Sequence, residues 1–286
     1  MDAKKLLADL GMSGHPAGLA GCRASGGHFE ACAHDIVVFD GGSGSETAES
    51  GGETAVVRHA SLSETRSGRL LGYDRMQVIC DESWELHMLL ARISQRRQML
   101  YADHTRHCLV ESLLCCQKSR QHSGVPGSCW QKCASYYLAD AICALNSGVP
   151  GSSHMLDALR GMQKAGGHVE TVTRTVGTER ATPTLLERMS KSAVGLADMA
   201  GLVSKTIGSK CAYLMKNSMP SDCYFYLCYS SRESFVSLMG ASGKKPDIEH
   251  ISKTAFDIES DPNMVMQHVE LVEASCNELL GESHQK

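Results

Sequence analysis

Residues 17–40 contain the residue types whose spacing is best suited to chemistry in this chain. A run of small side chains ends at Gly21 and Cys22, and glycine recurs at Gly26. Asp35 follows after a polar interval and leads into a β-rich run, Ile-Val-Val-Phe. Glycine lets backbone N–H groups approach a phosphate closely, and a nearby carboxylate can hold a divalent cation. The stretch predicts a strand, a glycine turn and a second strand with an acid at its head.

This stretch resembles the signature of the nucleotidyltransferase superfamily related to DNA polymerase β. Members carry Gly-Ser, a second glycine and an Asp-x-Asp pair that opens a strand. Gly21-Cys22 matches Gly-Ser, Gly26 matches the second glycine, and Asp35 matches the second acid. Cysteine replaces the usual serine, and Ala33 stands in place of the first acid. The resemblance covers about the first 85 residues, the size of a small domain.

The resemblance implies how the phosphates of a nucleoside triphosphate are held. Backbone amides of Gly21, Cys22 and Gly26 would contact the phosphates. Arg23 lies next to the turn and would neutralise one of them.

The resemblance also implies a magnesium site. Asp35 would hold Mg²⁺ together with a carboxylate from a later strand of the same sheet. Asp74 and Asp81 flank the next apolar run, and we assign the metal-binding and catalytic role to Asp35 and Asp81. The competing interpretation of Asp81 is a helix N-cap, because Asp-Glu-Ser-Trp is typical of a helix start.

Three functions stay open at this point. The first is binding of a nucleoside triphosphate with Mg²⁺, with transfer of a nucleotidyl group to an unknown acceptor as its active form. The second is an inactive pseudoenzyme that serves as a regulatory or protein-interaction module, which Ala33 favours. The third is RNA cleavage by the helical region, because Arg97 and His104 on one predicted helix are similar to the pair in HEPN-type ribonucleases.

A histidine-rich segment offers a further metal-binding hypothesis. His104, His107 and Cys108 share one face of a predicted helix, with His87 upstream. Such side chains bind zinc. The competing interpretation is a polar helix face with partly buried histidines, because no second ligand pair has recognisable spacing.

Composition narrows the class of protein. The 286 residues predict two domains, and the formal charge of −4 gives no general field for nucleic acid, although a local basic groove stays open. No apolar run approaches the roughly 20 residues needed to span a bilayer, and the N-terminal residues lack a signal-peptide core. We therefore expect a cytoplasmic protein without a membrane partner, whose 13 cysteines are mostly small buried apolar side chains.

The order of periodic segments predicts an α+β fold. A helix is expected at residues 4–10, a loop at 41–53, and strands at 36–39, 55–62, 69–73 and 76–80. From residue 83 onward apolar residues recur at helical spacing, beginning with a long helix or a broken pair. We predict a small mixed-sheet domain at residues 1–82 and an all-α bundle at residues 83–286. The repeated hexapeptide Ser-Gly-Val-Pro-Gly-Ser at 123–128 and 147–152 predicts two turns that bracket one helix.

Overall fold

The computed structural model describes residues 1–240, 246–258 and 261–283. The chain divides into two compact units, Met1–Asp103 and His104–Lys286. The first contains a five-stranded mixed sheet, and the second is largely helical. The predicted α+β class, with a mixed-sheet domain followed by a helical domain, is confirmed.

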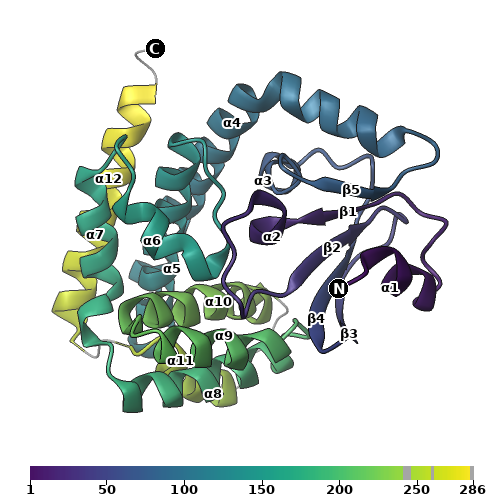
Figure 1. The fold of residues 1–286 in the computed structure, drawn as a ribbon. Helices are drawn as coiled ribbons and strands as arrows, with labels where there is room; N and C mark the ends of the chain where they lie inside the picture. The colour runs from purple at the N-terminus through teal and green to yellow at the C-terminus, as the bar shows by residue number, and fades with distance from the viewer. Residues whose placement is uncertain (241–245, 259–260, 284–286) are drawn as a thin grey trace. The chain divides into compact units, whose positions relative to one another are not determined.

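The sheet has the strand order β3-β4-β2-β1-β5 (Figure 1). β2 is parallel to β4 and antiparallel to β1, and the two edge strands are antiparallel to their neighbours. This pairing puts the end of β1 beside the start of β2. The strands are β1 (Ala17–Ala20), β2 (His34–Val38), β3 (Ser45–Ser50), β4 (Glu53–His59) and β5 (Gln77–Cys80).

Helix α1 (Ala3–Asp9) covers one face of the sheet. Its buried Leu6 and Leu7 pack in a cluster with Ile36, Val38 and Val57. Successive side chains of a strand point to opposite faces. The alternation therefore sends the odd-numbered residues of β2 to the other face.

Side chains from the segment before β5 cover that second face. A Cβ atom on Gly18 would lie 2.4 Å from the Met76 side chain, so glycine is needed for Met76 to lie over β1. The rings of Phe39 and Tyr73 meet edge to face, with centroids 5.3 Å apart. Both faces of the central strands are thus packed.

Two segments of the sheet unit differ from the sequence-based prediction. The predicted loop at 41–53 contains strand β3, joined to β4 by Gly51 and Gly52 with φ of +60° and +80°. Positive φ at both turn positions is typical of two-residue hairpins, and the polar composition hid an exposed edge strand. The strand predicted at 69–73 overlaps helix α3 (Ser67–Leu71), because a short apolar run does not distinguish a strand from a helix.

Helix α4 (Glu85–Gln121) is continuous over 37 residues. Leu86, Leu89, Ile93 and Leu100 form its buried stripe at the predicted spacing. These residues belong to the sheet unit, whose boundary at Asp103 lies inside the helix. The sequence-based boundary at residue 82 differs from this one by the N-terminal half of α4.

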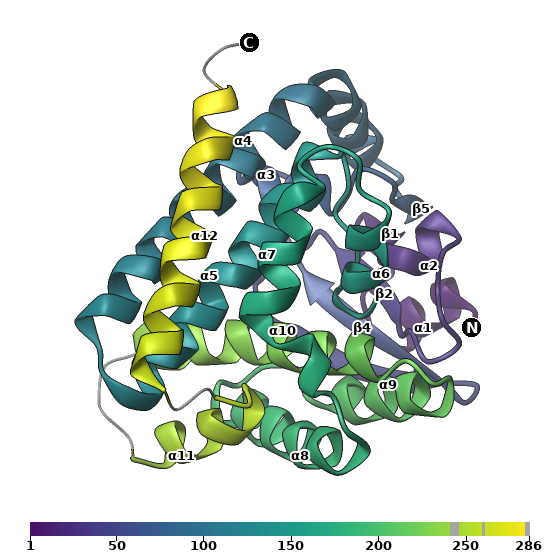
Figure 2. The same ribbon diagram turned by 90° about the vertical axis from the view of Figure 1, so that its left-hand side faces the viewer.

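The helical unit is built around two groups of helices. In the first, α5, α7 and α12 lie side by side (Figure 2). In the second, α8 packs against α9, α10 and α11, and α10 also contacts α5. None of the described helices is both long and apolar enough to cross a membrane. The bounds are α5 (Gly124–Leu145), α6 (Met155–Arg160), α7 (Gly167–Val176), α8 (Pro183–Met199), α9 (Lys205–Lys216), α10 (Pro220–Gly240), α11 (Pro246–Ala255) and α12 (Pro262–Ser283).

The repeated hexapeptide adopts two different structures. At 123–128 it forms the first turn of α5, whereas at 147–152 it is a loop that leads into the 3-10 helix Ser152–His154. Proline is tolerated in a first helical turn, where its missing N–H has no partner to lose. The prediction of two equivalent turns is therefore wrong for the first copy.

A buried lysine ties three parts of the helical unit together. Lys132 of α5 donates hydrogen bonds to the Tyr224 hydroxyl (2.9 Å) and to the carbonyls of Phe256 (2.6 Å) and Asp257 (3.0 Å). The Tyr224 hydroxyl in turn donates to Oδ2 of Asp257 (3.0 Å). Burial lowers the pKa of Lys132. These bonds satisfy polar groups that would otherwise cost free energy in the core.

Candidate functional site

Gly21 connects β1 to the short helix α2 (Gly21–Ser25). Its φ of +70° lies in the left-handed region, and a Cβ atom there would lie 3.2 Å from Oδ2 of Asp35. Both constraints favour glycine. Gly26, with φ of +83°, caps the helix by donating to the Cys22 carbonyl. Gly21, Cys22 and Gly26 therefore bracket one short helix at the end of β1.

Asp35 points toward Gly21 from the start of β2, where it pairs with Ala20. Arg58 of β4 engages both of its carboxylate oxygens. Nε of Arg58 donates to Oδ1 at 2.7 Å, and Nη2 donates to Oδ2. The side chains are 44% and 28% exposed for Arg58 and Asp35. The predicted metal ligand is thus already paired with a cation that water can reach.

Arg58 was not among the site residues predicted from the sequence. In the parallel register of β2 and β4, Arg58 lies opposite Val37, and Val56 lies opposite Asp35. Arg58 therefore shares the face of Asp35. The available signal was the arginine two residues after Val56 in a strand-like run. This arginine could be assigned to the site only once β4 was known to be the parallel neighbour of β2.

Asp81 lies at the other end of β1 from Asp35. The register pairs Cys80 with Ala17, whereas Asp35 pairs with Ala20, and three strand residues span roughly 10 Å. Ligands of one Mg²⁺ lie only about 2 Å from the ion. The structure therefore does not bring Asp35 and Asp81 together at one metal.

The carboxylate of Asp81 organises the start of α4 instead. Its Oδ2 accepts hydrogen bonds from the backbone N–H (2.9 Å) and Nδ1 (2.6 Å) of His87, and the side chain is fully buried. Burial by itself raises the pKa of Asp81, but the His87 bonds outweigh it and hold that pKa below its usual value. These contacts fit the capping interpretation and not the predicted catalytic role.

Asp74, the alternative third carboxylate, is also engaged within the sheet unit. Its Oδ1 accepts a hydrogen bond from Nε of Arg97 at 2.8 Å, and its side chain is buried. This bond links the segment after α3 to α4. It also occupies the arginine that the ribonuclease hypothesis required to be available.

Arg23 holds the segment that precedes β2. Its Nε donates to the Cys32 carbonyl at 2.6 Å, and Nη2 donates to the Glu30 carbonyl at 3.3 Å. Nη1 lies 4.0 Å from Oε1 of Glu53. The guanidinium is therefore used to fix the polar interval between α2 and β2, and the predicted phosphate contact would have to compete with these bonds.

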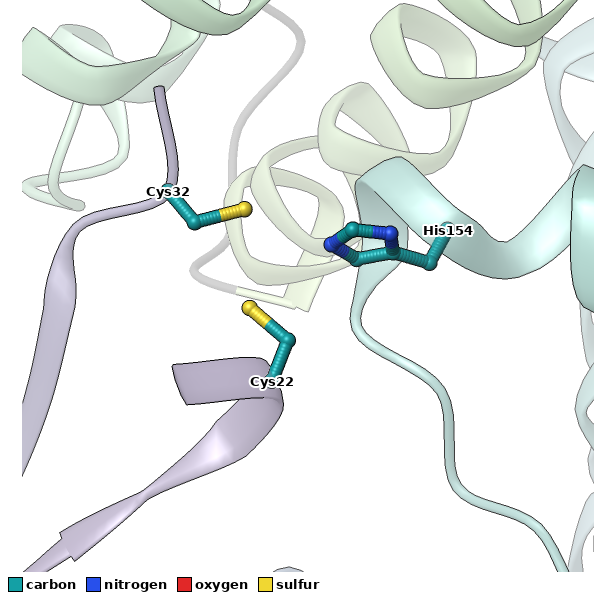
Figure 3. Close-up of side chains that lie close together, drawn as sticks. All are labelled: Cys22, Cys32 and His154. Atoms are coloured by element: carbon teal, nitrogen blue, oxygen red, sulfur yellow. The ribbon is translucent and has the colours of Figure 1, made fainter. Parts of the chain in front are cut away.

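Cys22 and Cys32 place two thiols near Gly21. Their sulfur atoms lie within 4.8 Å of each other and point into a shared space (Figure 3). Cys22 is half-buried on α2, and Cys32 is buried ahead of β2. Eleven of the 13 cysteines, all in the described residues, are buried, in line with the expectation of small apolar side chains. Cys22 was predicted at the site from the sequence, whereas its proximity to Cys32 was not.

The histidine-rich face of α4 does not gather into a metal site. The rings of His104 and His107 are 6.4 Å apart, and the Cys108 thiol is buried 3.7 Å from His104. Within the described residues these three do not bring their ligand atoms within 4.8 Å of one another. Burial lowers the pKa of His104 and raises that of Cys108. Both shifts favour neutral side chains packed on a helix.

No protein-family model matches the chain, and no curated protein matches it.

Proposed function

We propose that this chain is a nucleotidyltransferase-like protein that binds a nucleoside triphosphate with Mg²⁺ beside Gly21 and does not transfer a nucleotidyl group. The observation that carries the proposal is the ion pair of Asp35 and Arg58 at the Gly21 end of the sheet. It offers one carboxylate suited to a hard cation and one guanidinium suited to phosphate. Both side chains are within reach of water.

Because the pair is partly exposed, Arg58 and Asp35 can each take up a new partner at a small cost in free energy. The pair is bidentate, which strengthens it, but both side chains are partly exposed, so water screens it and its contribution is on the order of 1 kcal/mol. A triphosphate can draw Arg58 away through charge-assisted hydrogen bonds. Asp35 is then available to the Mg²⁺ that accompanies the nucleotide, which usually takes one or two carboxylates from a protein. The bound ion would neutralise part of the negative charge of the phosphates.

The distribution of acids argues against transfer. Chemistry that relies on two metal ions needs several carboxylates converging on one point. Ala33 stands where the resemblance expects the first acid. Asp74 and Asp81 are held by Arg97 and His87. Asp35 would therefore be the single carboxylate of the predicted set at this edge, which suits binding better than catalysis.

The experiment that tests the proposal measures binding and transfer side by side. The purified protein is titrated calorimetrically with ATP, GTP, CTP and UTP, with and without Mg²⁺, and is then incubated with α-phosphate-labelled nucleotide. We expect Mg²⁺-dependent binding of at least one nucleotide and no incorporation of label into protein or added RNA.

Two variants distinguish the loss of a specific metal ligand from a general change in the charge of the protein. Asp35→Asn removes the metal ligand and should abolish the Mg²⁺ dependence. Asp9→Asn makes the same change at an exposed position on α1 and should behave as the unmodified protein. Incorporation of label that Asp35→Asn abolishes would show an active transferase, and absence of binding for all four nucleotides would refute the proposal.

A further inference from the structure

A cavity of about 330 Å³ lies within the sheet unit, between α4 and residues 62–65. Two arginines on successive turns of α4, Arg92 and Arg96, line it together with the loop residues Ser63, Glu64 and Thr65. Its remaining wall is apolar, formed by Leu62, Leu70, Leu89, Ile93 and Leu100. The cavity therefore combines a cationic side with an apolar side.

Arg96 occupies a position that the helix pattern would give to an apolar residue. Leu89, Ile93, Arg96 and Leu100 follow one another at spacings of four, three and four, which place them on one face of α4. The leucines and the isoleucine are buried, whereas Arg96 stays exposed at the cavity. Arg96 therefore lies on the same helix face as the buried residues and lines the cavity beside them.

The acid that lines the cavity does not balance this charge. Oε1 of Glu64 accepts backbone hydrogen bonds from Thr65 and Arg66, both at 2.9 Å. Its two oxygens also lie 3.4 Å from the guanidinium nitrogens of Arg66 and Arg69. Glu64 is thus engaged by residues 65–69. Among the residues that the structure describes, Arg92 forms no ion pair.

We propose that this cavity binds a small organic phosphate monoester, with its phosphate between Arg92 and Arg96 and its carbon body against the apolar wall. Guanidinium groups recognise phosphate oxygens through paired hydrogen bonds. A volume of about 330 Å³ is at the small end of ligand pockets. The apolar wall excludes a free inorganic ion as the best occupant, because such an ion would leave that surface uncovered.

This site is separate from the pair of Asp35 and Arg58, and it does not rest on the function proposed above. None of its lining residues belongs to the nucleotide site. Glutamine at positions 92 and 96 should therefore leave nucleoside triphosphate binding unchanged. Loss of both binding events in those variants would show that one basic surface serves both ligands, and it would overturn the assignment of a distinct site.

The test uses calorimetric titration of the full chain with phenyl phosphate, inorganic phosphate and benzyl alcohol as probes. Phenyl phosphate should bind at least about 10-fold more tightly than either of the others, because it alone engages both sides of the cavity. Arg92→Gln and Arg96→Gln should each weaken it by about 10-fold, which is the loss of one charge-assisted contact. The matched control is Arg188→Gln, at an exposed position of α8, which should change nothing.

Three further results would overturn the proposal. The first is absence of phenyl phosphate binding, and the second is binding that neither arginine substitution reduces. The third is equal affinity for phenyl phosphate and inorganic phosphate, which would show a response to charge alone. Because both arginines are exposed, the variants are expected to fold, and far-ultraviolet circular dichroism checks this.

Discussion

Arg58 donates hydrogen bonds to both carboxylate oxygens of Asp35 across two neighbouring parallel strands. The pair lies at the end of β1, where Gly21 leaves no room for a side chain over the carboxylate. A carboxylate that would otherwise attract a cation is thereby held by an internal one. The nucleotide-binding proposal depends on how easily that internal cation is replaced.

Arg58→Gln removes the guanidinium and should weaken nucleoside triphosphate binding by about 10-fold, because a charge-assisted phosphate contact is lost. The free energy of unfolding should fall by only about 1 kcal/mol, because the pair is bidentate but partly exposed to water. Calorimetry and urea denaturation measure the two quantities. Arg75→Gln, at an exposed position of the same unit, serves as the control. A large loss of stability with unchanged nucleotide affinity would assign Arg58 a structural role.

Gly21→Ala should destabilise the protein by at least about 1 kcal/mol. The substitution forces a side chain into the left-handed region and places its Cβ 3.2 Å from the Asp35 carboxylate. Gly27→Ala is the matched control, because nothing lies within 4 Å of a Cβ there and its φ is not positive. It should cost no more than about 0.5 kcal/mol. Equal urea midpoints for the two variants would contradict the close approach of Gly21 and Asp35.

Cys22 and Cys32 should form a disulfide when the protein is treated with hydrogen peroxide. Their sulfur atoms lie within 4.8 Å of each other, and a disulfide of about 2 Å forms between them once the two side chains rotate toward each other. The two thiols together lose two hydrogens, and one peroxide is reduced to two waters. Peptide mapping by mass spectrometry detects the linked peptides. Cys32→Ser should abolish the link, and separate alkylation of both cysteines after oxidation would contradict the geometry.

Stability should decline as the pH rises above about 8.5, because buried thiols resist ionisation. Burial raises the pKa of Cys276 to about 11, whereas a thiol in the unfolded chain ionises near 8.5. Between those values the unfolded chain releases a proton that the folded chain retains. The contribution of Cys276 is therefore complete below the unfolded pKa and declines as the pH rises, by up to about 1.4 kcal/mol per pH unit.

Urea denaturation between pH 8 and pH 11 in reductant measures this slope. Cys276→Ala should flatten it, while the buried neighbour Ser275, replaced by alanine, should leave it unchanged. Identical slopes in the two variants would show that Cys276 ionises normally in the folded protein.

Local sequence was sufficient for several features of the fold. Helical periodicity located the buried stripe of α4, and the order of residues placed Asp35 near the head of the strand that follows the glycine turn. These features depend on residues close together in the chain, whose geometry is set by backbone periodicity and turn chemistry.

Tertiary structure decided the features that depend on distant partners. One hexapeptide starts a helix at 123–128 and forms a loop at 147–152. Asp81 could be a metal ligand or a helix cap by sequence, and the antiparallel register of β5 with β1 places it away from Asp35. The partner of Asp35 is Arg58, which is 23 residues away. Strand order and register arise from burial of whole sheet faces, so the sequence determined which residues could react, and packing determined which of them meet.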